Sequence, residues 1–311
     1  MATSDGKKIM CVGLCCVDII SVVQSFPVED TDQRSLDYYW RRGGNAANST
    51  TVLALLGSNV EFMGTLVKSQ EYGFLKTDFE AFNVSIGNCA VYDEGNIRCP
   101  VAVVIVNKQN GSRTIMAALN NIAELRYEDF ERVSLENYRW IHFEGRNNVD
   151  TIKQMIQRIV TYNERVPVDE KVRISLELEK TKRTDLIPLM TQPDYVFVSK
   201  EFAAAQGYRS KEEAVSGMVH KCKPGGAVIC AWGEDGAAAK TTTDDVITSS
   251  IFPPENLVDT LGAGDTFNAA TIYALSKDRT LQEAVTFGCK IAGAKCGVVG
   301  YKGIKGLQTL L

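Results

Sequence analysis

Histidine is scarce in this chain of 311 residues, which contains only His142 and His220. Nucleophilic or general-base chemistry that relies on histidine therefore has little material to work with. No G-x-x-x-x-G-K-[ST] string occurs, so any nucleotide phosphate must be held by another device. The chain also lacks a clustered Lys/Arg run, and its 34 basic and 38 acidic residues give a net charge of −4. This composition provides no basic surface for nucleic acid.

Long apolar runs and paired cysteines are also missing. The most apolar segment near the start, residues 9–23, is interrupted by Asp18 and is too short to cross a membrane. The first residues, MATSDGKK, carry no signal-peptide pattern. The nine cysteines are an odd number without a C-x-x-C pair, which argues against a disulfide scaffold or a zinc site. We therefore expect a cytoplasmic protein that does not associate with membranes.

The hydrophobic content of 45% allows a large core, and apolar strand-like segments alternate with helical patterns nearly throughout. Several of the strands are apolar on both faces, which is typical of a buried parallel sheet. This pattern predicts a single α/β domain over residues 1–311, doubly wound, with ligands at the carboxyl ends of the strands. Strands are expected at residues 9–14, 60–63, 140–143, 172–178, 195–198 and 227–231, and helices at 46–56, 151–162, 211–219 and 281–289.

Two segments interrupt this alternation, at residues 18–41 and 90–119. The first continues as extended, mixed sequence where a helix would follow. The second contains PVAVVIVN and RTIMAAL around Asn110-Gly111, a dipeptide that favours a hairpin turn. We expect the two segments to form a small β-sheet that projects from the domain as a lid. The alternative is a pair of surface hairpins with no role.

The segment DTLGAGDTFNAA, residues 259–270, is the most informative stretch of the chain. Gly262 and Gly264 flank a small residue, and the apolar segment after Asp265 predicts a helix. A glycine turn that opens a helix leaves amide groups unpaired at the positive end of the helix dipole, which suits a phosphate or an oxyanion. Asp265 is then either a helix cap or a general base beside that anion site. The glycines allow a ligand to approach the backbone, which a cap does not require, so they favour the base.

A second glycine-rich turn, RRGGNAANS at residues 41–49, precedes another expected helix. Asn45 and Asn48 are three residues apart and so share one face of its first turn. A carboxamide both donates and accepts hydrogen bonds, as a sugar hydroxyl does. Together with Gly44, and with Asp18 just beyond the first strand, these residues predict a site for a polyol. The alternative is that Asn45 caps the helix and Asn48 lies in solvent.

These two turns resemble the two signatures of the ribokinase-like (PfkB) family of sugar and nucleoside kinases. Residues 259–265 match the C-terminal signature without a gap, and GGNAAN matches the N-terminal G-G-N-x-x-N element. Within the family, the chain is similar along nearly its whole length to the members that phosphorylate fructose. The pieces that carry this similarity are CVGLCCVDIISVV, RRGGNAANS, GSRTI, WIHFEGRN, FVSKEFA, CAWGEDGA, FPPENLVDTLGAGDTFNA and FGCKIAGAKCG.

The resemblance implies a ribokinase-like fold and ATP-dependent phosphorylation of D-fructose at the 1-hydroxyl, giving fructose 1-phosphate and ADP. In the family, the aspartate that matches Asp265 removes a proton from the acceptor hydroxyl, and the preceding amides hold the phosphoryl group. The residues that would contact the sugar are Asp18, Gly44, Asn45, Asn48 and Asp265. Those that would contact ATP are Arg113, Gly233, Glu234, Asp235, Gly236, Gly262, Ala263 and Gly264.

Taken by themselves, the residues on the ATP side leave alternatives open. Arg113 follows the expected hairpin turn, where a guanidinium can bind a phosphate with two hydrogen bonds or can simply be exposed. The segment GEDG, residues 233–236, follows an expected strand, where an open α/β sheet binds nucleotides. It is equally compatible with an ordinary turn. Trp232 packs either beside an adenine or into the core.

The sequence lacks the motif that organises magnesium in many kinases of this family. Many kinases of this family carry an N-x-x-E motif that organises magnesium, and the comparable stretch here, residues 199–202, is SKEF. We therefore leave the metal ligands unassigned. The resemblance still implies Mg²⁺ with ATP, activation by K⁺ and a homodimer formed through the lid.

Two other functions remain open at this point. The first is a related kinase for ribose, adenosine or another sugar, because the motifs specify the family better than the ligand. The second is a sugar-binding regulator of the same fold without catalysis. The complete glycine turn and Asp265 argue against the regulator, since binding alone does not require a base.

Overall fold

The computed structural model describes residues 6–311. The first five residues, which are part of the segment expected not to be a signal peptide, lie outside the described residues. Its main element is an eight-stranded sheet of order β14-β13-β12-β11-β10-β9-β1-β4. The six strands from β4 to β12 are parallel, and β13 and β14 are antiparallel additions. The strands are β1 (Lys8–Val12), β4 (Val60–Met63), β9 (Tyr138–Glu144), β10 (Arg173–Leu178), β11 (Tyr195–Ser199), β12 (Ala227–Ala231), β13 (Ala237–Thr241) and β14 (Ile247–Ser249). The predicted mostly parallel α/β sheet is confirmed.

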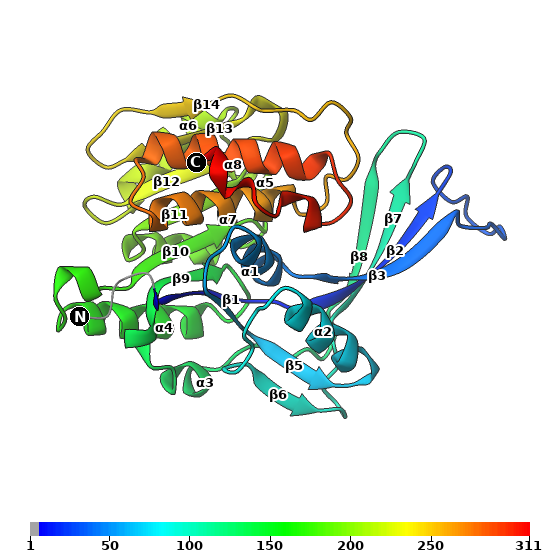
Figure 1. Ribbon diagram of the computed structural model, residues 1–311, viewed down its shortest axis with the longest axis horizontal. Helices are drawn as coiled ribbons and strands as arrows, with labels where there is room; N and C mark the ends of the chain where they lie inside the picture. The colour runs from blue at the N-terminus through cyan, green and yellow to red at the C-terminus, as the bar shows by residue number, and fades with distance from the viewer. Residues whose placement is uncertain (1–5) are drawn as a thin grey trace.

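Helices cover both faces of this sheet because its parallel strands are apolar on both sides. Alternate residues of β1 belong to different cores: Ile9 and Cys11 pack with α1, α7 and α8, whereas Met10 and Val12 pack with α4, α5 and α6. Figure 1 shows α1, α7 and α8 in front of the sheet. These helices are α1 (Asn45–Leu55), α4 (Val149–Asn163), α5 (Lys200–Ala205), α6 (Lys211–Met218), α7 (Ala263–Ser276) and α8 (Leu281–Cys296). The chain is therefore doubly wound, as expected.

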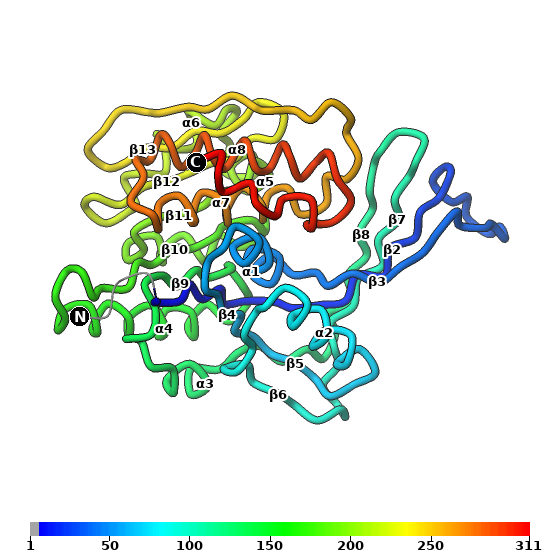
Figure 2. The backbone as a smooth tube through the Cα atoms, viewed as in Figure 1, coloured from blue at the N-terminus to red at the C-terminus, as the bar shows by residue number. Residues whose placement is uncertain are grey.

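A separate four-stranded sheet, called here the small sheet, projects from one side of the body (Figures 1 and 2). Its order is β3-β2-β7-β8, and Gly111 at the tip of the β7–β8 hairpin has a φ of 71°, a value that favours glycine. The strands are β2 (Cys16–Val23), β3 (Asp37–Gly43), β7 (Val101–Asn107) and β8 (Arg113–Ala118). The two interrupting segments of the sequence therefore meet in one sheet, as predicted.

The expected boundaries of that sheet were too wide in one place. Residues 90–93 do not join it, because β6 (Ala90–Asp93) pairs in parallel with β5 (Thr65–Lys68) in a two-stranded sheet. The composition of this strand, AVYD, suits either sheet, and the pairing with β5 decides between them. The segment 18–41 is likewise interrupted, since residues 24–36 form a loop between β2 and β3.

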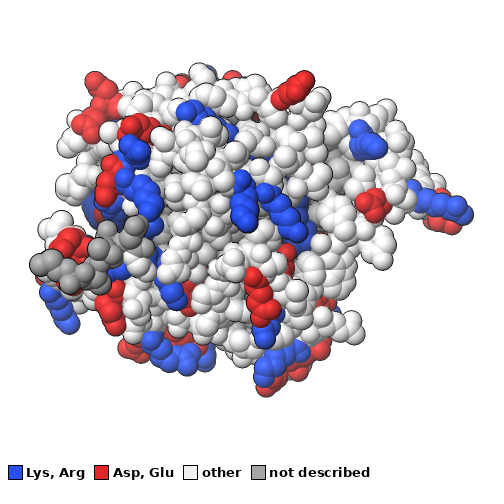
Figure 3. All heavy atoms as spheres, in the orientation of Figure 1, with Lys and Arg blue, Asp and Glu red and all other residues white. Residues whose placement is uncertain are grey.

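Apart from the 12-residue helix α2, the remaining elements are short. The helices are α2 (Gln70–Ala81) and α3 (Tyr127–Glu131), and the 3-10 turns lie at Leu135–Asn137, Val168–Glu170, Thr184–Thr191, Val219–Lys221, Gly233–Asp235, Lys302–Ile304 and Leu307–Leu310. Within residues 6–311, no helix is both long enough and apolar enough to cross a membrane. On the face shown in Figure 3, acidic and basic side chains are interspersed among uncharged surface, and neither sign forms one continuous patch.

Arg42 fastens the small sheet to the body. It lies at the end of β3 with 3% of its surface exposed, and its Nε donates to Asp78 Oδ2 of α2 at 2.7 Å. Its Nη2 donates to Thr51 Oγ1 of α1, and its guanidinium lies 4.1 Å from the centre of the Phe79 ring. One side chain therefore joins β3 to two helices of the body.

Arg42→Ala should lower the free energy of unfolding by about 3 kcal/mol, because it leaves the carboxylate of Asp78 without its buried partner. Urea denaturation of the purified variant measures this loss. The matched control is Arg34→Ala in the exposed β2–β3 loop, which should stay within about 0.5 kcal/mol of wild type. Equal stability of the two variants would contradict the role assigned to Arg42.

Candidate active site

The two glycine turns of the sequence meet where α1 and α7 begin. Asn48 Nδ2 donates to Asp265 Oδ2 at 2.8 Å, and Ser49 Oγ donates to the backbone oxygen of Asp265 at 3.4 Å. Asn48 and Asp265 are each 8% exposed. The structure therefore brings together two predicted site residues that are 217 positions apart in the chain.

Gly262 forms the turn before α7, and its φ of 81° lies in the left-handed region. Ala263 N donates to Thr260 O at 3.2 Å, and Thr266 N opens the helical ladder to Gly262 O at 2.9 Å. The amides of Gly264 and Asp265 lie between these bonds, at helix positions that have no intrahelical acceptor. A Cβ added to Gly264 would meet nothing within 4 Å, so its backbone faces open space. This end of α7 can accept an anion, as the sequence predicts.

The cap interpretation of Asp265 is not supported. The N-cap position of α7 is Gly262, and the Asp265 side chain receives its hydrogen bond from Asn48 of another helix. Burial, together with the charges of Glu179 and Glu144, raises the pKa of Asp265 to about 7, although the Asn48 hydrogen bond and Lys180 oppose the shift. A carboxylate with a pKa near neutrality is suited to accept a proton at physiological pH.

The first turn of α1 excludes the alternative in which its asparagines have only a capping or a solvent-exposed role. Gly44 is the N-cap, with a φ of 100°, and an added Cβ would lie 2.1 Å from Leu14 O, so only glycine fits there. Asn45 is the first helical residue, and its Nδ2 donates to Glu177 Oε2 at 3.2 Å and to Glu179 Oε2 at 3.4 Å. The alternatives in which Asn45 caps the helix and Asn48 lies in solvent are both wrong.

Asp259 holds the loop that leads to this turn. Its Oδ2 pairs with Arg41 at 2.8 Å and Lys295 at 2.9 Å and accepts from Gly300 N at 3.0 Å, while its Oδ1 accepts from Leu261 N at 2.9 Å. Burial alone would raise the pKa of Asp259, but the charges of Arg41 and Lys295 lower it to about 2. Asp259 belongs to the C-terminal signature, but its place in the sequence alone predicts no role for it.

The small sheet contributes polar groups on the side of the same loop. Arg113 is exposed, but its Nη1 donates to Thr260 Oγ1 at 2.5 Å. Asp18 lies opposite Arg41 in the β2–β3 pairing. Burial raises the pKa of Asp18, and the Cys16 hydrogen bond and Arg41 oppose the shift. The sequence interpretation of Arg113 as an anion ligand is therefore compatible with its position beside the glycine turn.

Three carboxylates that the sequence analysis did not single out complete the site. Glu144 is the last residue of β9 and accepts from Leu14 N at 2.9 Å and from Ala46 N at 3.2 Å. It therefore accepts a hydrogen bond from the first turn of α1, as a capping side chain would, because the N-cap residue Gly44 has no side chain. Glu177 lies in β10, and Glu179 follows it. Carboxylates near the ends of otherwise apolar strands were the available signal, because the carboxyl ends of parallel strands share one edge.

The turn at residues 233–236 follows β12 at the same edge of the sheet. Gly236 has a φ of 83°, and an added Cβ would lie 2.1 Å from Ser249 O, so packing alone accounts for this glycine. Glu234 pairs with Lys200 at 3.0 Å, and Trp232 is 6% exposed within the core. The core interpretation of Trp232 is therefore supported, and nucleotide binding at this turn stays a prediction.

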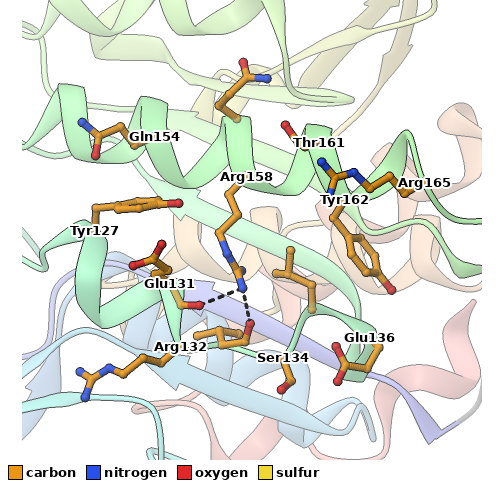
Figure 4. Close-up of a pocket in the computed structure, with 13 residues that line it drawn as sticks. Tyr127, Glu131, Arg132, Ser134, Glu136, Gln154, Arg158, Thr161, Tyr162 and Arg165 are labelled. Atoms are coloured by element: carbon orange, nitrogen blue, oxygen red, sulfur yellow. Dashed lines mark hydrogen bonds between the residues drawn. The ribbon is translucent and has the colours of Figure 1, made fainter.

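A hollow with a volume of about 810 Å³ lies elsewhere, between α3 and α4 (Figure 4). None of its lining residues belongs to the constellation around Asp265. Arg158 at its centre donates through Nη2 to Glu131 O at 2.9 Å and Val133 O at 2.8 Å, which ties α4 to the segment after α3. We assign this hollow no ligand. Within residues 6–311, no group of three or more acidic, His or Cys side chains is arranged to hold a metal ion.

Comparison with known proteins gives a match over nearly the whole chain. The model of the pfkB family of carbohydrate kinases matches residues 6–303. Ketohexokinase of Mus musculus is 45% identical over 298 residues, which cover 96% of this chain and 99% of that protein. Among solved structures, ribokinase from Giardia lamblia superposes with a TM-score of 0.82 at 16% identity, covering 97% of both chains. Ribokinase from Cryptococcus neoformans var. grubii in complex with ADP has a TM-score of 0.74 at 16% identity, covering 98% of both.

The two glycines of the α7 turn should respond differently to alanine. Gly262→Ala should lower the free energy of unfolding by at least about 1–2 kcal/mol, the cost of a left-handed residue with a Cβ. Its Cβ would also lie 2.0 Å from the Tyr301 hydroxyl oxygen. Gly264→Ala should leave stability unchanged or slightly higher, because its site is open and alanine favours the helix. Thermal unfolding of both variants checks this, and equal shifts would contradict it.

Proposed function

Because the chain belongs to the pfkB family of carbohydrate kinases, we propose that it transfers the γ-phosphoryl group of ATP to the 1-hydroxyl of D-fructose. The products are fructose 1-phosphate and ADP. The observation that carries the choice of sugar is the 45% identity to a ketohexokinase over 96% of the chain. The nine cysteines are all free, which supports a reducing, cytoplasmic compartment.

The sugar occupies the space between the small sheet and the start of α1. Asp18, Gly44, Asn45 and Asn48 surround the hydroxyl groups, and Asp265 lies against the reacting one. The supporting observation is the contact of Asn48 with Asp265, which puts a carboxamide and a poised carboxylate next to each other. A carboxamide and a carboxylate satisfy hydroxyl groups that both donate and accept.

In the transfer step, Asp265 takes the proton of the sugar hydroxyl as its oxygen forms a bond to the γ-phosphorus. The bond between that phosphorus and the bridging oxygen breaks, and ADP leaves with the electron pair. The amides of the turn before α7, above all the unpaired ones of Gly264 and Asp265, stabilise the charge of the phosphoryl oxygens, and the open space before Gly264 supports this role. Arg113 moves from Thr260 to an ATP phosphate, which a guanidinium binds with two hydrogen bonds.

ATP lies along the strand-end edge from the α7 turn to Gly233, Glu234, Asp235 and Gly236. Mg²⁺ accompanies ATP through its phosphates, which is the usual mode for this ion. We assign Mg²⁺ and the activator K⁺ no side-chain ligand, because the described residues offer no metal-binding group.

A panel of acceptors with Mg-ATP tests the proposed function. Fructose should be phosphorylated faster than ribose or adenosine, and the product should be the 1-phosphate by ³¹P and ¹³C NMR. Faster turnover of ribose or adenosine would assign a different kinase of the same family. Binding of sugar without ADP release would favour the non-catalytic regulator.

Asp265→Asn should lower kcat by about 10²–10⁴ while it preserves the fold, because it removes the base. The wild-type kcat/KM for fructose should fall about tenfold per pH unit below the raised pKa of Asp265, since only the ionised carboxylate accepts the proton. Steady-state kinetics between pH 5.5 and 8.5 measure this acid limb. A folded Asp265→Asn variant with near wild-type turnover would disprove the base assignment.

The small sheet also supports a proposal about assembly. A row of residues crosses its four strands on one face, because Trp40 pairs with Ile19, Ile19 with Val103, and Val103 with Met116. Trp40, Val103 and Met116 are 40%, 38% and 51% exposed. Apolar surface of this kind is typically covered, and we propose that the small sheet of a second copy covers it and forms the homodimer. The sheet then acts as the lid of the sugar site.

Replacing Val103 and Met116 with Glu should convert the dimer to a monomer, because two charges would be buried in the apolar interface. Light scattering at micromolar concentration measures the mass, and the fructose KM of the variant should rise. The matched control is Val168→Glu, which introduces the same charge at an apolar residue of the body that is 83% exposed. A monomeric wild-type protein at this concentration would rule out the interface.

A further inference from the structure

Glu177 connects the two helices that carry the proposed sugar site and base. Its side chain is buried, and Oε1 accepts from Asn268 Nδ2 of α7 at 2.8 Å while Oε2 accepts from Asn45 Nδ2 of α1 at 3.2 Å. Asn45 lies three residues before Asn48, and Asn268 lies three residues after Asp265, so each is about one helical turn from the reacting pair. Glu177 thus spans α1 and α7 directly beside their Asn48–Asp265 contact.

We propose that Glu177 is a positioning residue for phosphoryl transfer, which holds α1 and α7 at the separation that sets Asn48 against Asp265. This inference rests on the proposed function. Near the site, α1 and α7 are also joined by the Asn48–Asp265 contact itself and by the 3.4 Å bond from Ser49 Oγ to Asp265 O. Gly44 gives α1 no side-chain cap that could fix its start. Glu177 adds a connection anchored in β10, and a strand of the central sheet is a rigid support.

Glu177 acts through hydrogen bonds and not as a charge. Burial, followed by the charges of Asp265, Glu179 and Glu144, raises its pKa well above the usual range, and the Asn45 hydrogen bond opposes the shift. Burial and the acidic neighbours therefore favour the neutral form of the Glu177 carboxyl. A protonated carboxyl still accepts through one oxygen and donates through the other, and either carboxamide can turn to match it.

The groups around Asp265 define what the pH profile reports. Glu179 and Glu144 face it from the strand ends and raise its pKa, and Lys180 lowers it. Tyr301 is packed nearby, and its pKa is raised by burial and then by Asp265. If Glu177 is neutral while Asp265 titrates, replacement of Glu177 by glutamine leaves the acid limb of the profile where it is.

The experiment compares Glu177→Ala and Glu177→Gln with the same changes at Glu61. Glu61 is a matched control because it is also buried, in β4, and accepts from Lys8 at 2.9 Å, Asn88 at 2.8 Å and Tyr138 at 2.9 Å. None of these partners belongs to the site. The measurements are thermal unfolding, kcat, KM for each substrate, and the pH dependence of kcat/KM.

Glu177→Ala should lower kcat about 30- to 100-fold and raise the KM for the sugar but not for ATP, because a displacement near 1 Å has an effect of this order. Glu177→Gln should restore kcat to within about fivefold of wild type, with an unmoved acid limb. Glu61→Ala should lower the melting temperature with little effect on kcat. A Glu177→Ala variant that loses only thermal stability would overturn the proposal. So would a Glu177→Gln profile whose midpoint falls, because Glu177 would then act on Asp265 by its charge.

Asn268→Ala provides a second variant if Glu177→Ala does not fold. It removes only the α7 side of the connection and should lower kcat in the same direction, whereas wild-type kcat would overturn the proposal. All variants are assayed with the acceptor that wild type phosphorylates fastest, so a wrong sugar overturns the proposed function alone. If wild type phosphorylates no acceptor, calorimetry of fructose binding makes the same comparison. Unweakened binding by the Glu177→Ala and Asn268→Ala variants then overturns the positioning role.

Discussion

The arrangement of the site depends on the ion pairs of Asp259. One carboxylate joins Lys295 of α8, Arg41 of the small sheet and the backbone at Gly300 and Leu261. Because these partners lie on different parts of the chain, the loop before α7 is fixed from several directions. The Lys295 side chain is wholly buried. Without Asp259, no water could solvate its ammonium group in place of the carboxylate. The exposed amides at the start of α7 can therefore keep their direction without help from a ligand.

A site with fixed amides still requires a base that ionises near neutrality, and burial provides it. Asp265, Glu144, Glu177 and Glu179 converge where two neighbouring strands and two helices begin or end. Burial and the neighbouring carboxylates raise the pKa of both Asp265 and Glu177, because ionised groups that share a buried space repel one another. Asp265 has the nearby amide donor of Asn48 and the charge of Lys180, which oppose the shift, and Glu177 is also buried. The same crowding that would destabilise an ordinary core thus prepares one carboxylate to exchange a proton.

Much of this site was predictable because its signals are local. A glycine turn followed by an apolar helix determines where α7 begins, and the strands at 60–63 and 227–231 have the bounds expected from the sequence. The convergence of Glu177 with Asn45 and Asn268 was not predictable, since it depends on β10 lying next to β9 in the sheet. The position of residues 90–93 depends in the same way on a choice between two sheets. Neither choice leaves a trace in local composition.

Two arginines join the small sheet to the loop that leads to the α7 turn. Arg41 and Arg113 come from the two edge strands of the small sheet, β3 and β8, and they contact the consecutive residues Asp259 and Thr260. Arg41 is half of a shielded ion pair, whereas Arg113 is exposed and bound to a neutral hydroxyl, a weaker partner than a phosphate. The first contact therefore holds the sheet in place while the second is free to exchange. In the reaction proposed above, such a division would allow the sheet to stay over the sugar while Arg113 turns to the nucleotide.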